Sequence, residues 1–107
     1  MHGVDGISFT AMNVGDRLEL LTGETHWQIN KLSATHYWLS IVKGIEGPSR
    51  ITPIGTMVDE VLSTDWVQEG GHFHFVNHRT EQNESLGPIV LLAWTKNYTL
   101  IEEPADA

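Results

Sequence analysis

The chain has 107 residues, of which 40% are hydrophobic and 19% charged, so we expect one globular domain rather than two cores or a disordered segment. It contains no cysteine, which excludes disulfides, thiolate metal sites and cysteine nucleophiles. The formal net charge is −8, and because such a surface repels phosphate backbones, direct binding to nucleic acid is not expected.

Short segments typical of β-strands dominate the first half of the chain. Residues 1–11 are polar and glycine-bearing, and they predict a flexible segment or, at most, an edge strand. Apolar and polar residues alternate over 14–21 and 25–32, and aromatic and β-branched residues are concentrated over 36–42. Each of these three segments predicts a β-strand.

The period of the pattern changes at residues 53–63, where apolar side chains recur at the 3.6-residue spacing of a helix. A threonine before Pro53 supplies a helix start signal. We therefore predict one helix there, possessing an apolar face made of Ile54, Met57, Val58, Val61 and Leu62. Residues 64–70 fit either an extension of this helix or a strand. We favour a β-hairpin that turns about Gly70 and joins residues 65–68 to 72–76.

The last third of the chain combines polar loop with apolar strand. Residues 77–87 are polar and predict a loop, whereas the continuous apolar run 88–95 predicts a central strand covered on both faces. Residues 98–103 predict a final strand. The domain is expected to span 12–102, with 103–107 as a loose C-terminal tail.

Together these elements predict a single α+β domain, mainly antiparallel sheet, in a small SH3-like or related partly open barrel with one helix plugging an end. The order of "GDRLEL", "HWQINKL", "YWLSIV" and "GTMVDEVL" resembles small SH3-like barrels found among bacteriophage and prophage accessory proteins. The resemblance covers roughly residues 14–67 and implies a non-enzymatic binding module. It carries no functional residue over to this chain.

The stretch "GGHFHFVNH" holds the densest group of reactive side chains. Because side chains alternate along a strand, Phe73 and Phe75 are expected in the core, with His72, His74 and His78 on the outer side. Histidines two residues apart lie about 7 Å apart at the backbone, a spacing that suits two ligands of one Zn²⁺ or Fe²⁺ ion. His78 lies too far along a continuous strand to join them. The alternatives to a small metal-binding domain or cupin-like enzyme are a solvent-facing row of histidines and a pH-dependent surface.

Trp38 is the outward aromatic residue that best fits a contact surface. Tyr37, Leu39 and Ile41 make the buried face of its strand, which leaves Trp38 outward beside His36. The predicted function is protein binding without catalysis or cofactor, by a phage- or mobile-element-type accessory protein that docks on a host protein and modulates it. Inhibition by charge mimicry is one version of this role. The binding surface would combine Trp38 and His36 with the acidic residues Asp59, Glu60, Glu69, Glu81 and Glu84.

Acidic residues favour a basic host partner, including a nucleic-acid-binding protein whose groove the acidic surface fills. A homodimer through sheet edges is also compatible with a small open sheet. No apolar run is long enough to span a bilayer, and the N-terminus lacks the basic start and apolar run of a signal peptide. We therefore expect a soluble protein of the cytoplasm, that of the host cell if phage-encoded, without membrane contact.

Overall fold

The computed structural model describes residues 6–42 and 48–96, which form an almost entirely antiparallel β fold. Mainly antiparallel sheet is confirmed, but the predicted α+β class is wrong, because the helical residues in the described ranges form a single 3₁₀ turn, η1 (Phe9–Ala11). The predicted strand over 98–103 and the tail lie outside the described residues. The strands are β1 (Gly6–Ser8), β2 (Arg17–Thr22), β3 (Thr25–Lys31), β4 (Tyr37–Ile41), β5 (Ser49–Val58), β6 (Val61–Thr64), β7 (Trp66–Gln68), β8 (His72–Asn77), β9 (Gln82–Leu86) and β10 (Ile89–Thr95).

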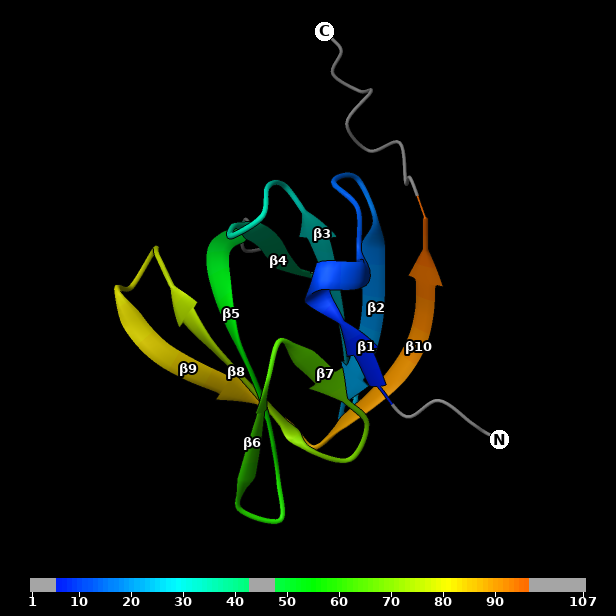
Figure 1. Ribbon diagram of the computed structural model, residues 1–107, viewed down its shortest axis with the longest axis vertical. Coiled ribbons are helices and arrows are strands. Elements are labelled where there is room, and N and C mark those ends of the chain that lie inside the picture. Colours follow the sequence, from blue (N-terminus) through cyan, green and yellow to red (C-terminus); the bar gives the residue numbers. More distant parts are fainter. Residues whose placement is uncertain (1–5, 43–47, 97–107) are drawn as a thin grey trace, which may run out of the picture.

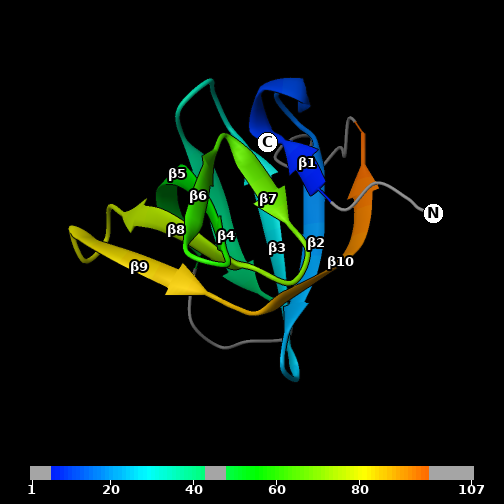
Figure 2. The same ribbon diagram turned by 60° about the horizontal axis from the view of Figure 1, so that its bottom comes forward.

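The strands form one large sheet and one small one. The large sheet has the order β10-β2-β3-β4-β5-β8-β9, with β6 paired to β5, and the small sheet pairs β1 with β7. The large sheet curves around a core, and β9 passes directly into β10, so the chain itself connects the two ends of the sheet order (Figure 1). Figure 2 shows the small sheet lying across the open side of the curved sheet.

Alternation along the strands decides which side chains enter the core. Phe73 and Phe75 on β8 are 0% and 1% exposed, so the prediction that both rings face inward is confirmed. Their rings pack against each other with centroids 5.1 Å apart. The other fully buried apolar side chains come from several strands of the two sheets and include Leu18, Leu20, Ile29, Tyr37, Ile51, Val67 and Ile89.

The 3₁₀ turn η1 packs against the core at one end of the curved sheet, whereas the helix predicted to plug an end was residues 53–63. Phe9 packs edge-on against Tyr37, with ring centroids 5.0 Å apart, and lies 5.6 Å from the Phe73 ring. The buried Lys31 side chain on β3 donates hydrogen bonds from Nζ to the carbonyl oxygens of Phe9 (2.9 Å) and Met12 (2.6 Å). One lysine therefore satisfies two carbonyls of the turn and fastens it to the sheet.

Residues 53–63, predicted as a helix, instead run through β5, a two-residue turn and β6. Asp59 and Glu60 occupy the turn with φ of 52° and 69°, the conformation of a type I′ hairpin. Gly55 on β5 has a φ of 155°, and a Cβ there would lie 2.3 Å from the carbonyl oxygen of Ser63. The close approach of the two backbones at this point therefore requires glycine.

Three further predictions in the second half of the chain are corrected. The hairpin expected between residues 65–68 and 72–76 does not form, because β7 pairs with β1 whereas β8 pairs with β5 and β9. The predicted loop 77–87 contains β9. The apolar run 88–95 forms β10 at one end of the sheet order, not a central strand, and leaves Val90 and Leu92 47% and 45% exposed.

Within the two described ranges, no helix has the length and apolar character needed to cross a membrane.

Candidate functional site

Trp38 lies on the outer face of β4, as the alternation predicts. Its neighbours Tyr37 and Leu39 are buried in the core, while the indole is half-buried on the opposite side of the strand. The register of the sheet places Asn30 of β3 beside it on one side and Arg50 of β5 on the other. Cross-strand partners share a face of the sheet, so these three side chains project together.

Arg50 stacks on Trp38, and both side chains line a shallow groove. The guanidinium carbon lies 5.4 Å from the centroid of the indole ring, which is a cation–π contact. Arg79, from the turn between β8 and β9, borders the same groove, which has a volume of about 280 Å³. The side chains that line this "Trp38 groove" are those of Trp38, Pro48, Ser49, Arg50, His78 and Arg79.

A pair of histidines flanks the groove. The rings of His36 and His78 stack with centroids 5.0 Å apart, and His78 Nε2 lies 2.6 Å from Thr52 Oγ1. The backbone N–H of His78 donates to the carbonyl of Arg50 at 2.9 Å. These contacts fix the position of the β8–β9 turn, and therefore of Arg79, relative to β5.

The two arginines of the groove carry positive charge that the described part of the chain does not neutralise locally. Among residues 6–42 and 48–96, neither Arg50 nor Arg79 has a carboxylate oxygen within 4.0 Å of its guanidinium. The whole chain has only six lysine and arginine residues against fourteen acidic residues. Two of those six cations thus lie beside one accessible tryptophan, on a molecule that is otherwise strongly acidic.

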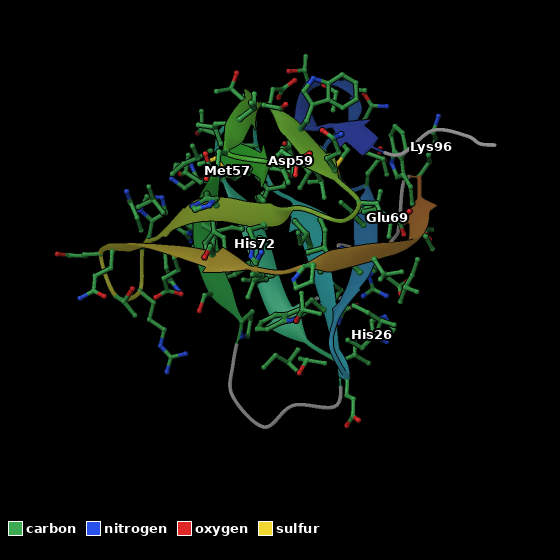
Figure 3. All side chains as sticks on the ribbon, turned by 90° about the horizontal axis from the view of Figure 1, so that it is seen from below. His26, Met57, Asp59, Glu69, His72 and Lys96 are labelled. Carbon is green, nitrogen blue, oxygen red and sulfur yellow. The ribbon has the colours of Figure 1, made fainter. Side chains whose placement is uncertain are left out.

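The acidic residues predicted to act with Trp38 and His36 are distributed over separate turns and strands. Asp59 and Glu60 form the tip of the β5–β6 hairpin, and Glu69 lies in the β7–β8 turn, where its Oε2 accepts from the backbone N–H of Leu91 at 3.1 Å. Figure 3 shows Asp59 and Glu69 well separated. Glu81 lies in the β8–β9 turn with a φ of 61°, and Glu84 lies on β9.

The histidine row divides between β8 and the turn that follows it. His72 is paired with Met57 and His74 with Gly55, both on β5, while His78 lies beyond the end of β8 beside His36. His72 is the first residue of β8, which runs beside β9 (Figure 3). In the part of the chain that the structure describes, no group of three or more histidine or acidic side chains is placed to hold a metal ion. Binding of Zn²⁺ or Fe²⁺ by His72 and His74 stays a prediction.

Trp38 and His36 are candidates that the sequence pattern predicts, whereas it gives no sign of Arg50 and Arg79. Arg50 lies directly opposite Trp38 only because β5 pairs with β4 in one particular register. Arg79 reaches the groove only because β8 pairs with β5. Neither arginine lies in a motif, so knowledge of the strand order was the missing signal.

Comparisons with protein-family models, with curated proteins and with solved structures give no match for this chain. The resemblance to phage SH3-like barrels and the homodimer therefore stay predictions.

Proposed function

We propose that this protein is a binding module that docks an acidic segment of a partner protein in the Trp38 groove. The observation that carries the proposal is the pairing of an accessible indole with two arginines that have no carboxylate partner among the described residues. Arginine binds carboxylates in a bidentate geometry, and tryptophan and arginine are the residues most enriched where binding energy is concentrated.

The proposal changes the expected partner chemistry at this surface. The predicted acidic surface favours a basic partner, whereas the side chains around Trp38 favour an acidic one. Arg50 is held against the indole, so part of its conformational freedom is already lost before a ligand arrives. The net charge of −8 opposes long-range attraction of an acidic partner, so recognition here depends on contacts within the groove.

The β5–β6 hairpin supports a second candidate function that keeps the basic partner. It projects from the barrel (Figure 1) and carries Asp59 and Glu60 at its tip, next to Val61 and Leu62, which are 64% and 40% exposed. Exposed apolar side chains bordered by charge are typical of contact surfaces. We propose this hairpin as the surface that would meet a basic host protein.

The groove is tested by NMR titration with a glutamate-rich peptide containing one tyrosine, compared with the same peptide in which glutamine replaces glutamate. We expect shifts at the Trp38 indole N–H with the acidic peptide and little effect of the neutral one. Arg50→Gln and Arg79→Gln should each weaken binding of the acidic peptide about tenfold. Each variant removes one guanidinium group, which can donate two hydrogen bonds to a carboxylate. High salt should weaken the complex further.

Lys96→Gln is the matched control, because Lys96 also lies over an indole, with Nζ 4.8 Å from the centre of the Trp94 ring. It removes the same charge from a different cation–π pair and should leave affinity unchanged. Equal losses in all three variants would indicate general charge attraction and refute the groove. Loss of binding to a basic polypeptide in Asp59→Asn/Glu60→Gln, with the groove variants unaffected, would instead favour the hairpin.

A further inference from the structure

A small cavity opens at the end of the barrel away from η1. It has a volume of about 140 Å³ and is lined by Trp27, Leu39, Ile41, Phe75, Glu84 and Leu86, together with two serines and an asparagine. Trp27 lies on β3 four residues before Lys31, the residue that fastens η1 at the opposite end. Mouths of β-barrels are common ligand sites, because strand ends leave space there that the core does not fill.

The walls of the cavity combine polar and apolar side chains and hold a fixed aromatic ring. Leu39 and Phe75 are buried members of the core, and Leu86 packs against that core. The Trp27 indole donates from Nε1 to Thr22 Oγ1 at 2.7 Å, which limits rotation of the ring. A ligand in this space would therefore meet a preformed surface of apolar and polar side chains, with a π system on one side.

Glu84 places one negative charge in this wall, beside the aromatic and aliphatic side chains. It is the cross-strand partner of Phe75, so its side chain starts on the inward face of β9. Its carboxylate accepts from Asn77 Nδ2 at 3.2 Å and from Thr80 Oγ1 at 2.9 Å, both neutral donors. No lysine, arginine or histidine nitrogen in the described ranges lies within 4.0 Å of it.

We infer that this cavity binds a small organic cation of the quaternary ammonium class. The size fits, because a cavity of about 150 Å³ accommodates a ligand as large as benzene. The charge fits, because Glu84 supplies an anion and Trp27 a ring that attracts cations. Each Glu84 oxygen already accepts one hydrogen bond, which leaves the carboxylate about two of its four acceptor positions. A primary ammonium has three N–H groups to satisfy, so the site favours a cation without N–H groups.

The probe for this site is tetramethylammonium chloride, titrated into the intact protein and followed by NMR at the Trp27 indole N–H and the Leu86 methyl groups. We expect saturable shifts in the millimolar range, beyond those caused by sodium chloride at equal concentration. tert-Butanol, a neutral molecule of similar size, should bind about tenfold more weakly, because it lacks the charge that Glu84 and the indole recognise.

Glu84→Gln keeps the shape and one acceptor oxygen but removes the charge, and it should weaken tetramethylammonium binding about tenfold. Glu81→Gln removes the same charge from the exposed β8–β9 turn and should leave binding unchanged; a thermal melt of each variant verifies that it is folded. Shifts no larger than those of sodium chloride, equal binding of tert-butanol, or unchanged affinity in Glu84→Gln would overturn the inference. Neither variant alters Arg50 or Arg79, so the groove proposal stands or fails independently.

Discussion

At the scale of single residues, Tyr37 shows how burial changes the chemistry of a side chain. Its ring is 1% exposed, and its hydroxyl donates to the carbonyl of Phe9 at 3.3 Å. Burial, and to a lesser extent the nearby carboxylate of Asp65, raises the pKa of the Tyr37 phenol well above its ordinary value. Both causes oppose formation of a phenolate inside the core.

This shift predicts a loss of stability at alkaline pH. Above about pH 10 the unfolded chain releases the Tyr37 proton while the folded protein retains it, so the free energy of unfolding falls as pH rises. Below that pH the contribution is fully present and constant. Urea unfolding at pH 8, 10 and 11 measures the effect, and Tyr37→Phe should show a shallower decline. Parallel curves for the two proteins would assign the alkaline loss to other groups.

Trp38 illustrates what the sequence can and cannot reveal about a site. Its outward orientation follows from the alternation of Tyr37, Leu39 and Ile41, which depends only on local geometry. Its stacking partner Arg50 lies twelve positions further along the chain, on another strand. No local pattern specifies that pairing, because it results from the register between β4 and β5. The chemistry of the surface was therefore not predictable from the sequence.

At the scale of elements, the β5–β6 hairpin explains why a helix was predicted. A two-residue turn makes Val58 the partner of Val61, three positions away, and Met57 the partner of Leu62, five positions away. Apolar residues paired across such a turn reproduce spacings close to those of one helix face. The strand β9 was missed for a different reason: its sequence, Gln82–Leu86, is mostly polar and exposed and shows no apolar alternation.

The turn itself offers a test at this scale. Asp59 and Glu60 both have positive φ, which costs residues with a Cβ about 1 kcal/mol each. Replacing them with Asn-Gly, the pair that type I′ turns favour, should raise the free energy of unfolding by about 1 kcal/mol. Urea denaturation measures the change. In a helix, the same glycine would lower stability by about 1 kcal/mol, so the sign distinguishes the two structures.

Asp59→Asn/Glu60→Gln is the control for that experiment. It removes the same two charges without introducing glycine. It should therefore raise the free energy of unfolding by much less than Asn-Gly does. If this control stabilised the protein as much as Asn-Gly, relief of charge repulsion would explain the result, and the backbone argument would fail.

At the scale of the whole molecule, local sequence patterns predicted individual strands better than the order in which the strands pair. Alternation predicted the early strands and the inward orientation of Phe73 and Phe75, because a one-residue error would expose the whole apolar face. Strand order depends on contacts between distant segments. The pairing of β7 with β1, and the passage of β9 into β10 from one end of the sheet order to the other, have no local signature. The long apolar run therefore seemed central although it forms an end strand.

We expect the attachment of η1 to the curved sheet to depend on Lys31, a buried cation of β3. Lys31→Met keeps the length of the side chain but removes the donor to the carbonyls of Phe9 and Met12. We expect the free energy of unfolding to fall by about 2 kcal/mol, because the Met12 carbonyl loses its donor and the Phe9 carbonyl keeps only its bonds from Met12 and Tyr37. This cost should exceed the gain from no longer burying an ammonium group. Urea unfolding measures this loss, and Lys96→Met, which alters an exposed cation, should have little effect.

Hydrogen exchange separates local loosening of η1 from general destabilisation. The amide of Met12, which donates to the carbonyl of Phe9 at 3.1 Å, should exchange much faster in Lys31→Met. Amides of the β3–β4 ladder, such as Ile29, should change only by the amount that global stability predicts. Unchanged stability, together with unchanged exchange at Met12, would mean that packing of Phe9 on Tyr37 and Phe73 suffices to close the barrel and that the lysine is dispensable.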